Sequence, residues 1–199
     1  MSALARRPFV DGYVFLEGPR WHDGCLWVSD IWAHKVYCIK EDGRAETAAD
    51  VPQRPSGLGF LPDGTPLIVS MQDRRVYRLE TGALQLHADL GGSVAADIND
   101  MVVDDQGRAY IGDMGYDLFG GGPSAPGGIV LVEPDGRHRI VADGLDFPNG
   151  MVITNSGDTL VVAESFGERL RAFDRAANGD LGNPRVYATL EGLVPDGIC

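Results

Sequence analysis

A short pattern, a glycine turn followed by an apolar strand, occurs four times in this chain at nearly constant spacing. The copies begin roughly 40 to 50 residues apart, a period typical of repeat architectures. They are Asp23–Asp30, Asp63–Ser70, Gln106–Asp113 and Ser156–Ala163. A unit of this length buries its apolar faces only by stacking on its neighbours. The repeat therefore constrains the fold more strongly than any single motif.

Further strand-like segments follow each copy. The second segments are Lys35–Ile39, Arg75–Leu79, Gly128–Val132 and Arg169–Phe173, and the third repeat also shows a closing strand at Ile140–Ala142. Four short antiparallel strands per repeat are typical of a propeller blade. No segment shows helical periodicity. We therefore predict an all-β chain that forms a β-propeller of four-stranded blades.

A glycine-rich stretch, Gly115–Gly127, lengthens the third repeat and has no strand pattern. We interpret it as an inserted loop at the rim of a site, because functional residues concentrate on loops held by a rigid scaffold. Asp113, Tyr116 and Asp117 at its start are expected to line a pocket.

Four repeats account for the chain up to about Leu193, and Val194–Cys199 resembles the opening of another. A propeller hides its strand edges by closing its ring. We therefore expect residues 1–199 to be one propeller domain that is incomplete at its C-terminus, with about four blades present.

The charge balance limits the classes of partner. The chain carries 17 basic and 29 acidic residues, a formal net charge of −12. This charge repels phosphate backbones and anionic lipid surfaces, so we expect no nucleic acid and no membrane partner. There is no apolar run of the roughly 20 residues that a membrane helix needs, and no apolar core of a signal peptide near the start. A cytoplasmic location is the default expectation.

The cysteines and the tryptophans are predicted to have structural roles. Cys25, Cys38 and Cys199 form no CxxC pair, so we expect free thiols in a reducing compartment, with Cys25 and Cys38 packed in strands. The tryptophans at 21, 27 and 32 are expected to fill space between blades.

Oxygen-bearing side chains occur where successive repeats begin. They lie in the segments Glu17-Gly18-Pro19, Asn99-Asp100, Asn149-Gly150 and Asp196-Gly197. In a propeller these segments would converge on the central channel. A buried carboxylate is costly, and a cation removes that cost. Two carboxylates and two amides suit a hard cation such as calcium or magnesium.

In this order, together with Trp21, these segments resemble the family of senescence marker protein, gluconolactonase and luciferin-regenerating enzyme. The resemblance implies a six-bladed propeller with a divalent metal at the channel mouth, most often Ca²⁺, with Zn²⁺, Mg²⁺ and Mn²⁺ as alternatives. By position, Glu17, Asn149 and Asp196 would be the metal ligands. Asn99 would hold the substrate or a water molecule on the metal.

The implied reaction is hydrolysis of a lactone, a small cyclic ester. The cation would polarise the carbonyl and lower the pKa of water, while a carboxylate handles the proton; Asp196 is the candidate catalytic carboxylate. We predict Asn99, Asp97 and Asp113 as the substrate-binding residues. Asp97 departs from the gluconolactonase pattern, which often has Arg there, so the preference for a hydroxyl-rich or anionic sugar lactone is open.

Two other functions stay open. The chain could be a non-catalytic ligand-binding propeller, since fold does not fix function. It could also be an organophosphate-type hydrolase that uses the same metal site with a different substrate pocket. A serine hydrolase is excluded because no G-x-S-x-G motif is present.

Overall fold

The computed structural model describes residues 8–154 and 156–199, and these residues form sixteen β-strands in four sheets. Blade 1 consists of β1 (Leu16–His22), β2 (Cys25–Asp30), β3 (Lys35–Lys40) and β4 (Ala45–Asp50), and blade 2 of β5 (Pro55–Phe60), β6 (Pro66–Ser70), β7 (Arg75–Glu80) and β8 (Ala83–Asp89). Blade 3 consists of β9 (Ile98–Val103), β10 (Ala109–Asp113), β11 (Gly127–Val132) and β12 (His138–Leu145), and blade 4 of β13 (Pro148–Ile153), β14 (Thr159–Glu164), β15 (Arg169–Arg175) and β16 (Leu181–Thr189).

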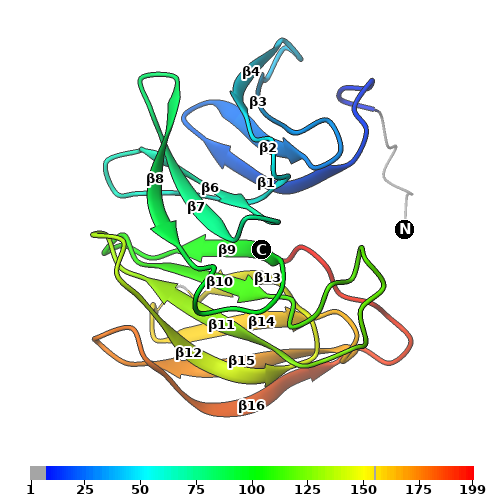
Figure 1. The fold of residues 1–199 in the computed structure, drawn as a ribbon, viewed down its shortest axis with the longest axis vertical. Coiled ribbons are helices and arrows are strands. Elements are labelled where there is room, and N and C mark those ends of the chain that lie inside the picture. The colour runs from blue at the N-terminus through cyan, green and yellow to red at the C-terminus, as the bar shows by residue number, and fades with distance from the viewer. Residues whose placement is uncertain (1–7, 155) are drawn as a thin grey trace, which may run out of the picture.

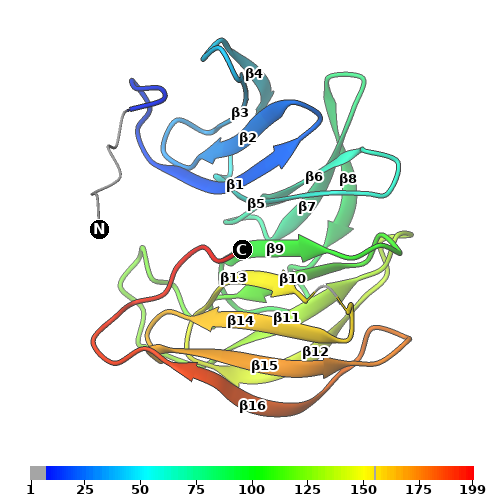
Figure 2. The same cartoon turned by 180° about the vertical axis from the view of Figure 1, so that it is seen from behind.

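Each blade is a four-stranded antiparallel sheet whose strands pair in chain order. The first strand of each blade lies toward the middle of the molecule, and β4 and β16 lie at the outside (Figures 1 and 2). The four repeat copies coincide with β2, β6, β10 and β14. The predicted all-β propeller of four-stranded blades is therefore confirmed.

The apolar core lies between the blades. One cluster joins blades 2 and 3 through Leu67, Val76, Ile98 and Met101, and two further clusters fill the spaces between blades 1 and 2 and between blades 3 and 4. Strand β11 is buried at every position, which requires cover on both faces. Stacking of sheets thus supplies the burial that a single four-stranded sheet lacks.

The stretch between β10 and β11 contains no strand, so the predicted insertion is confirmed. The prediction for the tryptophans was wrong for two of three. Trp21 is 57% exposed and Trp32 is 41% exposed. Trp27 alone packs against the core cluster between blades 1 and 2.

Cys25 and Cys38 form a disulfide, so the expectation of free thiols was wrong for this pair. The register of β2 and β3 places Cys25 opposite Lys40 and Cys38 opposite Trp27, which makes the cysteines diagonal neighbours with Cα atoms 5.6 Å apart. Spacing alone does not reveal this register. The argument for a reducing compartment therefore loses its support, and only Cys199 is a free, exposed cysteine in the described part of the chain.

We expect reduction of this disulfide to lower the free energy of unfolding by about 3 kcal/mol, because a cross-link between residues 13 apart restricts the unfolded chain. Urea unfolding of Cys25→Ala/Cys38→Ala against the oxidised protein measures the effect. The Cys199→Ser background serves as the control, since it removes thiol exchange without touching blade 1. Identical unfolding midpoints in oxidised and reduced protein would contradict the prediction.

Within the described residues, no helix is long and apolar enough to cross a membrane.

Candidate metal and substrate site at the inner strands

The first strands of the four blades share an irregularity at their starts. In each, the ladder with the second strand skips two residues: between Glu17 and Arg20 in β1, Pro55 and Leu58 in β5, Ile98 and Met101 in β9, and Pro148 and Met151 in β13. Such bulges release side chains from the alternation of the pleat and re-aim them. Ser56, Asn99 and Asn149 lie within the skipped pairs, and Glu17 borders the first.

Glycine lets these strand starts pack backbone to backbone. A Cβ on Gly57 would lie 2.6 Å from the Met101 nitrogen, so β5 touches β9 directly. A Cβ on Gly150 would lie 2.6 Å from the Asp196 carbonyl oxygen, and the Gly150 N–H donates to that oxygen at 3.2 Å. This contact holds the C-terminal segment beside β9 and β13 (Figures 1 and 2). It brings Asp196 to the start of the inner strands.

Glu17 and Asp196 lie near enough for their charges to interact. Burial, and then the charge of Asp196, raise the pKa of Glu17 to about 7, with a smaller contribution from Asp100; the Gly18 N–H opposes the rise. A carboxylate whose ionisation is opposed by a neighbouring acid marks a place where negative charge collects. Asp196 itself is exposed, whereas Glu17 is half-buried.

The two predicted asparagines present different atoms. Asn149 donates from Nδ2 to Ser165 Oγ at 3.1 Å, and its carbonyl oxygen has no hydrogen-bond partner within residues 8–154 and 156–199. Asn99 is buried, and its Oδ1 accepts from Ser56 Oγ at 3.0 Å. The free group is therefore an oxygen at Asn149, which suits a cation, and an amide N–H at Asn99, which suits a substrate oxygen.

Sequence reasoning missed the two serines that fix these amides. Ser165 Oγ also donates to the Pro195 carbonyl at 2.7 Å, so it ties Asn149 to the segment that carries Asp196. Ser56 could have been found, because Ser56-Gly57 repeats the polar-glycine pattern at the start of the second blade. Ser165 follows β14 and has no such signal.

Sequence reasoning assigned no role to Asp100, and the structure gives it a structural one. Its carboxylate is buried and accepts from Arg20 Nη2 and from the Met101 N–H, both at 2.8 Å. Burial raises the pKa of Asp100, while Arg20 and the Met101 N–H act in the opposite direction. Arg20 also donates to the Met101 carbonyl at 2.8 Å. This pair connects the inner strands of blades 1 and 3.

Asp97 and Asp113 are half-buried at the edge of the site. Burial raises the pKa of Asp97, and the charge of Asp117 adds to this, whereas Arg54 and Arg74 oppose it. Burial also raises the pKa of Asp113, against the Gly115 N–H and Arg74. The Asp113 carboxylate accepts from the Gly115 N–H at 3.0 Å, so it caps the start of the inserted loop.

The donor set fits a hard divalent cation. Glu17 and Asp196 supply carboxylates whose charges repel each other, and Asn149 supplies a free amide oxygen. Among the residues that the structure describes, no group of three or more His, Cys, Asp and Glu side chains could hold a metal ion. A site here would therefore depend on the amide oxygen as well as on the two carboxylates.

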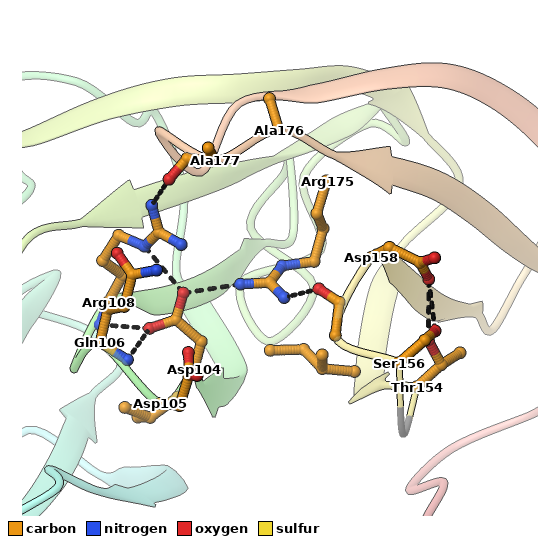
Figure 3. A pocket seen from close by; sticks show the side chains of 13 residues that line it. Asp104, Asp105, Gln106, Arg108, Thr154, Ser156, Asp158, Arg175, Ala176 and Ala177 are labelled. Atoms are coloured by element: carbon orange, nitrogen blue, oxygen red, sulfur yellow. Dashed lines mark hydrogen bonds and ion pairs between the residues drawn. The ribbon is translucent and has the colours of Figure 1, made fainter.

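A separate hollow of about 490 Å³ lies between blades 3 and 4, at the far ends of β9 and β13. Its buried charges pair with each other (Figure 3): Asp104 Oδ2 accepts from Arg108 Nε at 2.7 Å and from Arg175 Nη2 at 2.6 Å. Arg175 also lies over the Tyr110 ring, 5.3 Å from its centroid. These groups join the two blades, with one carboxylate shared by two guanidiniums.

Together the four blades and the polar groups at the starts of their inner strands define a β-propeller with an oxygen-lined channel mouth. Over residues 15–199 the chain matches the family described as SMP-30/Gluconolactonase/LRE-like region. The chain belongs to this family.

Relatives and solved structures agree with this assignment. Pentonolactonase XacC from Haloferax volcanii is 26% identical over 92% of this chain, and the chain spans 62% of that protein's length. The structure of XC5397, a gluconolactonase from Xanthomonas campestris, superposes with a TM-score of 0.81 at 25% identity, covering 95% of this chain and 67% of that one. Regucalcin from Agrobacterium tumefaciens, a calcium-binding protein, has the same fold, with a TM-score of 0.72 at 23% identity over 88% of this chain and 59% of its own.

Proposed function

We propose that this protein hydrolyses a lactone with the help of a divalent cation, most simply Ca²⁺, held by Glu17, Asn149 and Asp196. The observation that supports the proposal is the charge interaction of Glu17 with Asp196, together with a free amide oxygen on Asn149, whose partner Ser165 also holds the segment that carries Asp196. Membership of a family that includes gluconolactonases, and similarity to a pentonolactonase, support the reaction class.

A bound cation would polarise the ester carbonyl and lower the pKa of water. The protein's own groups then have separate tasks. The Asn99 amide, held through its oxygen by Ser56, is free to donate to a substrate oxygen. Asp196 accepts the proton that water releases as its oxygen adds to the carbonyl carbon. The ring C–O bond then breaks, the ring oxygen takes up a proton, and the open hydroxy acid leaves.

The test measures lactone hydrolysis by pH-stat titration. The protein is first treated with EDTA and is then supplied with Ca²⁺, Mg²⁺, Mn²⁺ or Zn²⁺. We expect turnover to disappear with EDTA and to return with at least one of these ions. Calorimetry with the same ions gives an independent measure of binding. Turnover that persists without any divalent ion would exclude the proposal.

Metal affinity should depend on pH through Glu17. A proton and a cation compete for its carboxylate, so the apparent affinity for Ca²⁺ should fall about tenfold for each pH unit below 7 and level off above it. Calorimetric titration between pH 5.5 and 8.5 measures the slope. An affinity that is unchanged across this range would contradict the role of Glu17.

The same pKa shift has a consequence for the metal-free protein. Because the folded pKa of Glu17 exceeds the ordinary value of 4.5, the folded state binds this proton more tightly than the unfolded chain. The contribution of Glu17 to stability therefore rises as the pH falls from about 7 toward 4.5, and it is lost as the pH rises through 7. The difference in thermal midpoint between wild type and Glu17→Gln at pH 5 and pH 8 isolates this contribution; an identical difference at both pH values would contradict it.

A further inference from the structure

The hollow between blades 3 and 4 lies away from the mouth, at the opposite ends of β9 and β13. Its volume is about 490 Å³, and its walls come from the turn after β9, the turn after β13 and the end of β15. Figure 3 shows the side chains of Arg108 and Arg175 in this space, between the residues of the two turns. A ligand bound here would therefore occupy a site separate from that of Glu17, Asn149 and Asp196.

The buried charges of this hollow do not balance. The side chains of Arg108 and Arg175 are each 6% exposed, and within the described residues Asp104, at 1% exposed, is the one acid that pairs with either of them. Its Oδ2 accepts from both guanidiniums, and its Oδ1 accepts from the N–H groups of Gln106 and Arg108, each at 2.9 Å. One positive charge is left without a partner, and an unpaired buried charge is costly.

The other partners of Arg175 are neutral. Arg175 donates from Nε to the Tyr110 hydroxyl at 3.2 Å and from Nη1 to the Gly157 carbonyl. The Tyr110 hydroxyl itself donates to the Gly179 carbonyl at 2.9 Å, so it is an uncharged phenol. These bonds fix the position of the Arg175 guanidinium, but they add no negative charge beside it.

Arg108 keeps a nitrogen for a further acceptor. Its Nε donates to Asp104, and its Nη1 donates to the Ala177 carbonyl at 2.7 Å. Its Nη2 has no acceptor in the part of the chain that the structure describes. The exposed side chain of Gln106 also lines the hollow, and its amide makes no hydrogen bond to another described residue. Two kinds of N–H donor, one charged and one neutral, are therefore available to a ligand.

Two acids at the rim limit which anion fits. Asp105 and Asp158 line the hollow but are exposed, and neither forms an ion pair with the two arginines in the described chain. Solvent screens exposed charges, so these acids offset the buried positive charge only weakly. They would still repel any second negative charge on a ligand. The hollow thus favours an anion of single charge.

We propose that this hollow binds a small monocarboxylate, whose oxygens accept hydrogen bonds from Nη2 of Arg108 and from the side-chain amide of Gln106. A carboxylate fits because it carries one charge on two neighbouring acceptor atoms. Its charge would complete the balance of a network that connects blades 3 and 4. The inference does not depend on the reaction at the mouth.

Fluorine NMR of trifluoroacetate, a small monocarboxylate, measures binding directly. The protein is treated with EDTA and dialysed into a buffer of low ionic strength, so that no metal ion at the mouth competes for the anion. We expect saturable binding, and we expect the Nε–H signals of Arg108 and Arg175 to shift in ¹H–¹⁵N spectra during the titration. Sulfate should compete at least about tenfold more weakly than acetate, because it carries a second charge. Stronger competition by sulfate, or arginine signals that do not move, would refute the site.

Gln106→Glu is the decisive variant, because it adds a negative charge to the hollow with almost no change in shape and leaves the buried network intact. We expect the affinity for trifluoroacetate to fall at least about tenfold. Asp105→Asn should raise the affinity about two- to fivefold, since it removes a repelling charge at the rim. Gln85→Glu makes the same chemical change at an exposed position of β8 and should have no effect. Unchanged affinity in both Gln106→Glu and Asp105→Asn, with unchanged thermal midpoints, would overturn the inference whether or not the protein hydrolyses lactones.

Discussion

Glu17→Gln should lower kcat/KM for lactone hydrolysis by about a thousandfold and remove measurable binding of Ca²⁺. The substitution keeps the shape of the side chain but removes one of the two charges that would hold the cation, and with it several kcal/mol of transition-state stabilisation. Steady-state kinetics with saturating Ca²⁺, together with calorimetry, measure the two effects. Glu46→Gln is the matched control, because it makes the same chemical change at an exposed position of β4, away from the inner strands.

The stability of Glu17→Gln distinguishes a functional role from a structural one. The repulsion between Glu17 and Asp196 disappears in this variant, so the metal-free protein should be more stable than the wild type at pH 8. We therefore expect activity and metal-free stability to change in opposite directions. Loss of both together would show that Glu17 maintains the fold and does not serve a cation.

Asp104→Ala should lower the free energy of unfolding by about 3 to 5 kcal/mol, the largest stability effect that we expect. The substitution leaves the guanidiniums of Arg108 and Arg175 buried without their shared carboxylate; both side chains are 6% exposed, and that of Asp104 is 1% exposed. Figure 3 shows Asp104 between the two arginines. Urea unfolding at neutral pH measures the loss.

Asp135→Ala provides an internal control for this experiment. Asp135 accepts from the backbone N–H and the Nε of Arg137 as Asp104 does from Arg108, but this pair is exposed. Exposed pairs contribute little, so we expect a far smaller loss of stability than in Asp104→Ala. If Asp104→Ala and Asp135→Ala lose the same stability, burial does not determine how much the Asp104 network contributes to the free energy of unfolding.

The parts of the fold that the sequence predicts are those with a local signal. Turn glycines and apolar strands repeat at a fixed phase, so β2, β6, β10 and β14 were predicted at the observed places. Glu17, Asn99, Asn149 and Asp196 were found in the same way, because each stands beside a glycine or acid at the start of a repeat. Their roles as ligands and as substrate-binding groups stay predictions.

The parts that the sequence does not predict depend on register and on contacts between blades. The Cys25–Cys38 disulfide requires the diagonal pairing of β2 with β3, which spacing alone leaves undetermined. Arg54 stands between residues 32 and 119 of two other blades, so its neighbours appear only when the ring is assembled. The exposure of Trp32 is likewise not predicted by its residue type, because tryptophan side chains are usually buried.

The bulges at the starts of the inner strands allow residues of the site to change without altering the strand pairing. The residues they release contribute no rung to the ladder with the second strand, so a change from Ser to Asn or Glu at one of them alters the mouth and leaves the sheet pairing intact. Blades 2, 3 and 4 thus each offer one such position, whereas Glu17 of blade 1 still pairs with Ser29 at the border of its bulge. A propeller built in this way can change its substrate one blade at a time, with little cost to its stability.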